Sequence, residues 1–519
     1  MTSRVAVSLC LLTLSLGCRS GEAPAATKAA QQTEPAPQPT LAPPPAPPVE
    51  LATGPATARF VSLSDLHFDP FLDPALVPKL AAAEAIEWGP LFEARYPSPG
   101  AASGTAGPAT QLGSYGGDTP YPLLRSALAA PQHASGWPPD YVIISGDFLA
   151  HSFRSRYQEL TGDDSDAGYR GFVDKTLQFL TVEINTSFPG IPIIPALGNN
   201  DSYCGDYLLE PGGTFLQMLA WLWAPLARGG PEFSQTFTAG GWYEVPHPKL
   251  EDHRLIVLNT VFFSTKYANS CAASPTPNAP DPTTDPTTVQ LEWLAQRLAA
   301  AEAAGHKVSL IYHIPPGVNV YSAVHAKTPG CPQTSELFWR DEPSTAFLAL
   351  VDQYHAIILA SFAGHIHTDD FRLTYPAAKP DTPTGFIHVT PAISPLFGNN
   401  PGFQVFDYDP SSGALRDFTT YALPLGAAAP SWQAAYSFNA AYATAADTDS
   451  DYDLVALART RARISTDPAV RAKYIAFNPV DNPDANQINA DNWRTYWCAT
   501  GTMTTTEFGA CMCPEPTSD

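Results

Sequence analysis

The sequence predicts an α/β protein built on two β-sheets, and two features of the chain predict this fold class. Short β-branched or apolar runs alternate with longer segments of helical period from residue 59 onward. The main runs each lead into a polar cluster, and they are residues 60–64, 141–145, 191–195, 308–311 and 357–360. Because functional groups collect at the carboxyl ends of strands in such sheets, we expect the clusters to form one site.

Helices are predicted between these runs where apolar residues recur at three and four positions. Segments 173–184 and 291–298 have this spacing, and Thr287 and Gln290 are placed to form a capping box before the second. Beyond residue 370 the pattern becomes strand-like, and a second sheet packed on the first would accommodate the pieces 371–375, 385–390 and 402–408.

Residues 59–424 are therefore expected to form the main domain, followed by a C-terminal extension over 425–519. The extension is rich in Ala, Asp and Asn, and its composition gives weak helical signals at 429–443 and 452–464. We expect it to pack on the main domain.

The first eighteen residues predict an export signal. Arg4 is followed by an apolar run from Val5 to Leu16, which is too short to span a bilayer. Residues 14–18 resemble a bacterial lipobox, with Ser15 where Leu is usual, so Cys18 would become the lipidated first residue of the mature chain. A plain secretory signal is the alternative. Either reading predicts a periplasmic or cell-surface protein of a bacterium, with membrane attachment only through this anchor.

A Pro- and Ala-rich linker is predicted over residues 19–58. The stretch contains almost no large apolar side chains, so it cannot bury a core, and its proline runs favour an extended tether.

The charge balance excludes one class of partner. The chain has 28 Lys and Arg against 50 Asp and Glu, a formal charge of −22, whereas sequence-independent binding of nucleic-acid polymers needs clustered cations. An anionic substrate would require a locally positive feature, which bound metal ions can supply inside an acidic surface.

The eight cysteines point to disulfides. Cys10 and Cys18 belong to the export signal, and the six others would enter an oxidising compartment, where fifteen pairings are possible. Zinc binding by these cysteines is the alternative, although no CxxC pair occurs.

The polar clusters together supply ligands for metal ions. Two Asp, one Asn and four His are the hard and borderline ligands expected for zinc, with manganese or iron as alternatives. They suit two divalent cations that share a carboxylate, lower the pKa of a bound water and clamp phosphoryl oxygens. The seven residues are Asp65, His67, Asp147, Asn199, His313, His365 and His367.

The order of these clusters, DxH, GD, GNxD, H and GHxH, resembles that of the calcineurin-like metallophosphoesterases. The closer resemblance is to the acid sphingomyelinase-like phosphodiesterases and the related endopolyphosphatases. It extends over about residues 59–410 and includes the segments 146–151, 258–260, 313–317 and 399–403. With it we expect a four-layer α/β/β/α sandwich carrying the metal site at the carboxyl ends of its strands.

The resemblance also implies a role for each ligand. One metal would be held by Asp65, His67 and His367, the other by Asn199, His313 and His365, with Asp147 as the bridge. His151 matches the position near the leaving group and would donate a proton or contact the phosphate. Asn200 replaces the His of many members, so it cannot act as an acid but could donate a hydrogen bond to a phosphoryl oxygen. A disulfide between Cys271 and Cys331 is implied as well.

These features predict a phosphoric ester hydrolase that cleaves a phosphodiester or phosphoanhydride by attack of a metal-bridging hydroxide on phosphorus. Two alternatives remain open at this point. The first is a phosphomonoesterase or nucleotidase, and the second is a metal-binding surface lipoprotein that has lost catalysis, which the Asn at position 200 motivates.

Overall fold

A computed structural model describes residues 57–97, 112–269, 285–325, 335–376, 382–444 and 451–513, which belong to one compact unit. The predicted export signal, the linker up to residue 56 and both cysteines of the predicted 271–331 bridge lie outside the described residues.

One sheet carries the first three predicted strands. Its strand order is β12-β11-β10-β1-β2-β3, and β1, β2 and β3 are parallel, with Phe60 beside Tyr141 and Val142 beside Ile193. Their carboxyl ends therefore lie along one edge. The strands are β1 (Ala58–Leu63), β2 (Tyr141–Ile144), β3 (Ile193–Pro195), β10 (Gly402–Tyr408), β11 (Leu415–Ala422) and β12 (Gln433–Ser437).

The other sheet carries the later predicted strands. Its order is β4-β5-β6-β7-β9-β8, and β5, β6, β7 and β9 are parallel. The strands are β4 (Tyr243–Pro246), β5 (His253–Val257), β6 (Lys307–Ile311), β7 (Ile358–Ala363), β8 (Asp370–Thr374) and β9 (Gly385–Val389).

The prediction that a second sheet accommodates the late strands holds for β8 and β9 and is wrong for β10. They are strands as predicted, but β8 and β9 extend the sheet of β7, whereas β10 lies between β1 and β11 in the other sheet. Periodicity reports which face of a strand is buried and not which strand lies beside it, so sheet membership could not be predicted.

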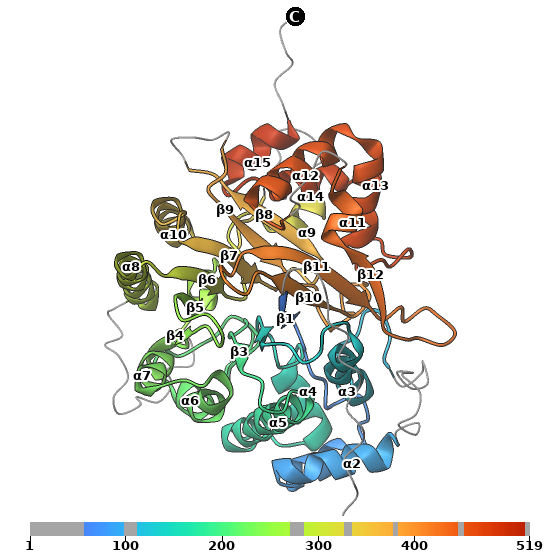
Figure 1. Cartoon of the computed structure of the whole chain (residues 1–519). Helices are drawn as coiled ribbons and strands as arrows, with labels where there is room; N and C mark the ends of the chain where they lie inside the picture. The colour runs from blue at the N-terminus through green and yellow to red at the C-terminus, as the bar shows by residue number, and fades with distance from the viewer. Residues whose placement is uncertain are drawn as a thin grey trace, which may run out of the picture. The chain divides into compact units, whose positions relative to one another are not determined.

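The two sheets pack face to face through aromatic side chains. The ring of Phe60 on β1 lies 5.4 Å from that of Phe362 on β7, and Phe362 lies 5.4 Å from Phe406 on β10. Helices cover the outer faces, because α6 packs against β3 and α8 against β6. Figure 1 shows α3, α5 and α6 on the side of β1–β3, and α8 and α10 on the side of β5–β7. The expected four-layer sandwich is confirmed.

The helices have the following bounds: α1 (Val77–Ala82), α2 (Trp88–Arg95), α3 (Tyr121–Ala129), α4 (Phe153–Thr161), α5 (Asp166–Ser187), α6 (Thr214–Ala227), α7 (Pro231–Gly240), α8 (Pro286–Ala304), α9 (Val320–Val324), α10 (Asp341–Gln353), α11 (Phe438–Tyr442), α12 (Leu454–Thr466), α13 (Pro468–Phe477), α14 (Trp493–Ala499) and α15 (Thr505–Met512).

The predicted capping box at the start of α8 is wrong. Asp285 caps this helix instead, accepting a hydrogen bond from the Thr287 backbone at 3.0 Å, and Pro286 occupies the first helical position. Gln290 is buried and bonds both backbone groups of Asn259, at 2.7 and 2.9 Å. The Gln290 side chain thus holds the backbone that follows β5 and does not cap the helix.

The C-terminal residues contribute to the sheet as well as to helices. The segment 429–443 predicted as helical contains both the edge strand β12 and the helix α11, and α12 agrees with the prediction at 452–464. Helix α12 contacts β8 and β9, and Figure 1 shows the C-terminal helices gathered beside these strands. A disulfide joins Cys498 on α14 to Cys511 on α15, which confirms disulfide formation in this region. Across the residues described, no helix is long and apolar enough to cross a membrane.

Candidate metal centre

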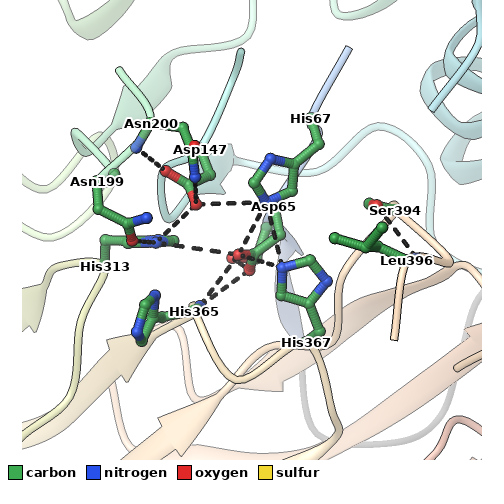
Figure 2. A network of polar contacts seen from close by, with 12 residues as sticks. Asp65, His67, Asp147, Asn199, Asn200, His313, His365, His367, Ser394 and Leu396 are labelled. Carbon is green, nitrogen blue, oxygen red and sulfur yellow. Dashed lines mark hydrogen bonds and ion pairs between the residues drawn. The ribbon is translucent and has the colours of Figure 1, made fainter. Parts of the chain in front are cut away.

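Five loops at the carboxyl ends of strands bring the seven predicted ligands together (Figure 2). We call this set of side chains the metal centre. Five of its residues have backbone φ angles in the left-handed region that L-residues avoid, and they are Asp65 (48°), His67 (39°), Asp147 (55°), His365 (71°) and His367 (65°). Such conformations cost about 1–2 kcal/mol each and persist where the surrounding structure imposes them. The loops therefore turn sharply, and the turns direct the side chains inward.

One group of ligands surrounds Asp65. Its Oδ1 lies 3.3 Å from Nε2 of His367 and 3.7 Å from Nε2 of His67, and the two Nε2 atoms are 3.2 Å apart. Ser64 Oγ at 2.5 Å and the backbone N–H of His365 at 3.0 Å donate to Oδ2 and orient the carboxylate. All these side chains are buried.

A second group surrounds His313. Its Nε2 lies 3.2 Å from Asp147 Oδ2 and 3.1 Å from Asn199 Oδ1, and a ring nitrogen of His365 lies within 4.8 Å of His313 and Asp147. The Asn199 amide is oriented by Asp206, whose Oδ1 accepts a hydrogen bond from Nδ2 at 2.7 Å. Asp206 was not predicted from the sequence.

Asp147 lies between the two groups. Its Oδ2 is 3.3 Å from Nε2 of His67 in the first group and 3.2 Å from Nε2 of His313 in the second. Figure 2 shows the carboxylate directed at both rings. Oδ2 of Asp147 thus faces both groups of candidate metal ligands.

The histidine tautomers show that these donors suit cations. Nδ1 of His67 lies 3.0 Å from the carbonyl oxygen of Leu149, and Nδ1 of His313 lies 2.7 Å from that of Ser145. A carbonyl oxygen only accepts, so each Nδ1 carries a proton and each Nε2 is directed at carboxylate oxygens. A positive charge, either a proton on Nε2 or a metal ion, must lie between these atoms, and metal-binding histidines commonly have this arrangement.

The spacing of the donor atoms fits metal ions of the expected size. Ligand bonds of about 2.1 Å in tetrahedral geometry separate the ligand atoms by about 3.4 Å. The donor separations given above for Asp65, His67, His367, Asp147, His313 and Asn199 range from 3.1 to 3.7 Å, and His365 lies within 4.8 Å of His313 and Asp147. The residues therefore fit a pair of divalent cations.

The pKa values of the buried histidines and carboxylates show how strongly these side chains interact. Burial lowers the pKa of His67, but the carboxylates of Asp147 and Asp65 outweigh it and raise the pKa to about 10. For His313, burial opposes the same carboxylates, led by Asp147, and the pKa rises to about 9. Burial raises the pKa of Asp65 and of Asp147, yet the neighbouring histidines hold both well below the usual range. Burial instead lowers the pKa of His367 to about 3 and that of His365 well below its usual range, so these two rings remain neutral donors.

Asn200 contacts the centre through Asp147. Its backbone N–H donates to Oδ1 at 2.8 Å, and its side-chain Nδ2 donates to Oδ2 at 2.9 Å. An amide nitrogen carries two hydrogens, so one of them remains for another acceptor. Asn200 therefore orients the carboxylate that faces both ligand groups.

His151 lies beside the first group and not within it. Its ring stacks on that of His67 with 4.2 Å between centroids, and its side chain is 32% exposed. Asp118 accepts hydrogen bonds from the His151 ring and backbone. This partner was not predicted from the sequence, because Asp118 follows no predicted strand.

Comparison with known proteins identifies relatives. No family model matches the chain. The chain is 27% identical over 446 residues to acid sphingomyelinase-like phosphodiesterase 3b of Mus musculus, covering 82% of this chain and 84% of the relative. It is 28% identical over 401 residues to the cyclic GMP-AMP phosphodiesterase of Rattus norvegicus, covering 75% of this chain and 78% of that one.

Among solved structures, a dimetal phosphatase from Danio rerio is similar at 12% sequence identity and a TM-score of 0.38, covering 70% of this chain and 95% of that one. The sequence relatives confirm the resemblance predicted from the motifs. Both relatives are named phosphodiesterases, which confirms the predicted enzyme class.

Proposed function

The chain is a homologue of acid sphingomyelinase-like phosphodiesterases, and on this premise we propose that it is an exported dimetal phosphoesterase that hydrolyses a phosphodiester or phosphoanhydride. The observation that carries the proposal is the position of Asp147. Its Oδ2 lies at nearly equal distances, 3.3 and 3.2 Å, from histidine nitrogens of two separate ligand groups. A carboxylate in this position is suited to bridge two cations.

The ligands divide as the resemblance implies. Asp65, His67 and His367 would hold one metal, and Asn199, His313 and His365 would hold the other, with Asp147 shared. Imidazole and carboxylate donors favour zinc, and manganese or iron would also fit. Two such ions would supply a nucleophilic hydroxide at neutral pH and would clamp the phosphoryl oxygens during in-line attack.

The protein's own residues then orient the substrate and move a proton. His151 is partly exposed beside the first ligand group, where it can donate a proton to the departing oxygen. Asp118 holds the ring in position. Asn200 keeps the Asp147 carboxylate oriented, and its second amide hydrogen can bond a phosphoryl oxygen.

We place the enzyme in the periplasm or on the bacterial cell surface, as a lipoprotein anchored at Cys18. This placement rests on the apolar run and the lipobox-like residues 14–18. A phosphate ester is the expected partner, and nucleic-acid polymers are not.

Metal analysis and a substrate panel test the proposal. The purified chain should contain about two divalent ions per molecule and hydrolyse bis-p-nitrophenyl phosphate. Asp147→Asn and His365→Ala should abolish this turnover, whereas Asp166→Asn, a change at an exposed carboxylate paired with Arg154, should not. Normal activity in both site variants would remove the metals from the mechanism.

The panel also separates the alternatives. A strong preference for monoesters over diesters and polyphosphates would replace the proposed activity with that of a phosphomonoesterase. Full metal occupancy without hydrolysis of any phosphate ester would identify a metal-binding protein.

A further inference from the structure

His365 differs from His67 and His313 in the contacts that orient its ring. Backbone carbonyl oxygens accept from Nδ1 of the other two histidines. The ring of His365 meets those of Phe338 and His313 edge to face, with 5.0 and 5.1 Å between centroids. Figure 2 shows His365 beside His313, and the Tyr207 hydroxyl lies 3.3 Å from its Nε2. The orientation of this candidate ligand therefore depends on the rings packed against it.

Phe338 contacts both His365 and a buried cation. The guanidinium of Arg372 lies over the Phe338 ring, 5.5 Å from its centroid. Arg372 lies on β8 and is 2% exposed. Burial lowers the pKa of Arg372 to about 10, and the charge of Asp370 opposes this effect, so the guanidinium is charged at neutral pH. Because the face of an aromatic ring attracts a desolvated cation, Arg372 holds Phe338 in place.

Arg372 also holds the loop that follows β6. Its Nη1 donates to the carbonyl oxygen of Pro316 at 3.0 Å, and its Nη2 donates to that of Val318 at 2.9 Å. Hydrogen bonds from a charged donor are stronger than those between neutral groups. The same loop binds the backbone of Phe338, whose N–H donates to the carbonyl oxygen of Gly317 at 2.9 Å. Arg372 therefore supports Phe338 both at its ring and through this loop.

The C-terminal extension packs against the loop as well. An added Cβ on Gly317 would lie 2.6 Å from Nη1 of Arg372 and 3.0 Å from the carbonyl oxygen of Thr502. The backbone N–H of Leu373 donates to the carbonyl oxygen of Thr500 at 2.7 Å, which joins the extension to the strand of Arg372. The loop after β6 is thus held by Arg372 and by the connection between α14 and α15.

We infer that Arg372 is a positioning residue for the second metal ion, the one assigned to the group around His313, because it holds Phe338 against His365. The C-terminal extension takes part by supporting the loop to which Arg372 binds. The inference rests on the proposed function for the presence of two ions. It adds that residues outside the seven ligands set the affinity for one of them.

Stepwise binding of Zn²⁺ to the metal-free chain tests this role. Calorimetric titration of the natural chain should resolve two ions, and His365→Ala identifies the second ion by the step that it weakens. Arg372→Met should weaken this step about tenfold, which corresponds to about 1.4 kcal/mol, and leave the other step within about twofold. Unchanged binding of both ions would overturn the inference. Equal weakening of both steps would overturn it too, because a general loss of structure affects both ions.

Arg254→Met is the matched control. Arg254 lies on β5 of the same sheet, and its Nη1 also donates to two backbone carbonyl oxygens, those of Glu251 at 3.2 Å and His253 at 3.3 Å. These contacts lie at the edge of the sheet opposite the metal centre. The control should leave both binding steps unchanged, and a weakened second step in Arg254→Met would contradict a specific role for Arg372.

Two further variants test the route through Phe338 and do not depend on the folding of Arg372→Met. Phe338→Leu keeps the guanidinium and its carbonyl partners but should weaken the second step, and an unchanged step would overturn the inference. Arg372→Lys keeps a cation without the fork of two donors, so its loss should be smaller than that of Arg372→Met. The double variant of Phe338→Leu and Arg372→Met should bind the second ion as the weaker single variant does. Additive losses would show that Arg372 acts by another route.

The titration needs no turnover, so it separates this inference from the proposed function. If two ions bind with this pattern across the variants but no phosphate ester is hydrolysed, the proposed function fails and the role of Arg372 stands. If the natural chain hydrolyses esters and Arg372→Met binds both ions as tightly as the natural chain, the role of Arg372 fails and the proposed function stands.

Discussion

Asp118 accepts hydrogen bonds from two atoms of His151, the backbone N–H at 2.9 Å and the ring Nδ1 at 3.0 Å. Because a carboxylate accepts, Nδ1 carries the proton and Nε2 is directed away from Asp118. Burial raises the pKa of Asp118, but the bond to His151 and the charge of His67 outweigh it and lower the pKa to about 2. The carboxylate is therefore ionised, and it holds the His151 ring through the hydrogen bond from Nδ1.

Asp118→Asn should slow the hydrolysis of esters with poor leaving groups by about 10²-fold, the lower range for loss of general acid catalysis. Esters of p-nitrophenol need little protonation and should lose less. The dependence of log kcat on leaving-group pKa, measured over a series of esters, should become steeper. A double variant with His151→Gln should be no slower than His151→Gln alone. An equal loss for every leaving group would assign Asp118 a merely structural role.

Gly198→Ala should lower metal occupancy and turnover by at least tenfold without unfolding the chain. A Cβ at this position would lie 2.1 Å from Oδ1 and 2.3 Å from the backbone nitrogen of Asp147, so the carboxylate facing both ligand groups must move. Metal content by elemental analysis and the thermal midpoint together check this outcome.

Gly171→Ala provides the matched control for that substitution. Gly171 lies within α5, and an added Cβ there meets no atom within 4 Å. The change should stabilise the chain by about 0.5–1 kcal/mol and leave metal content unchanged. Full metal content in Gly198→Ala would show that the centre tolerates displacement of Asp147.

His253 should make the fold sensitive to acid. It lies at the start of β5, at the edge of the sheet opposite the metal centre, and burial lowers its pKa to about 3. The unfolded chain binds this proton near the ordinary pKa of about 6.5. The folded state therefore loses stability as the pH falls from 6.5 toward 3, at about 1.4 kcal/mol per pH unit.

The contribution of His253 is measured as the difference in the free energy of unfolding between the natural chain and His253→Leu. Urea unfolding at pH 7, 6, 5 and 4 gives both values. His253→Leu also loses a 3.0 Å contact to Ser309 Oγ. This loss lowers the free energy of unfolding by a similar amount at each pH. The variant should show a shallower decline toward acid than the natural chain. Parallel curves for the two proteins would contradict the assignment.

The Cys498–Cys511 disulfide should stabilise the C-terminal helices. It closes a segment with a sequence separation of 13 and joins α14, which carries Tyr496, to α15. Replacing both cysteines with serine should reduce the free energy of unfolding by about 2–4 kcal/mol. Urea unfolding of the variant and of the natural chain measures this difference. An unchanged free energy of unfolding would contradict the prediction.

Prediction from the sequence was most successful where neighbouring residues determine the structure. The strand runs before Asp65, Asp147, Asn199 and His313 are strands in the structure, because buried β-branched residues favour that conformation wherever the strand lies. The assignment failed at α8, where Thr287 and Gln290 have capping spacing but turn toward Phe262 and Asn259. Contacts with distant residues outweighed a local pattern.

By itself, the sequence determined the types of the candidate ligands and their places at the ends of strands, since both follow from residue identity and local periodicity. Only the tertiary structure decided that these loops come from two sheets, that Asp118 holds His151 and that Gln487 reaches a pocket beside His365. These relationships join residues far apart along the chain. They depend on how strands pair and sheets stack, and the periodicity of a single segment carries no information about either.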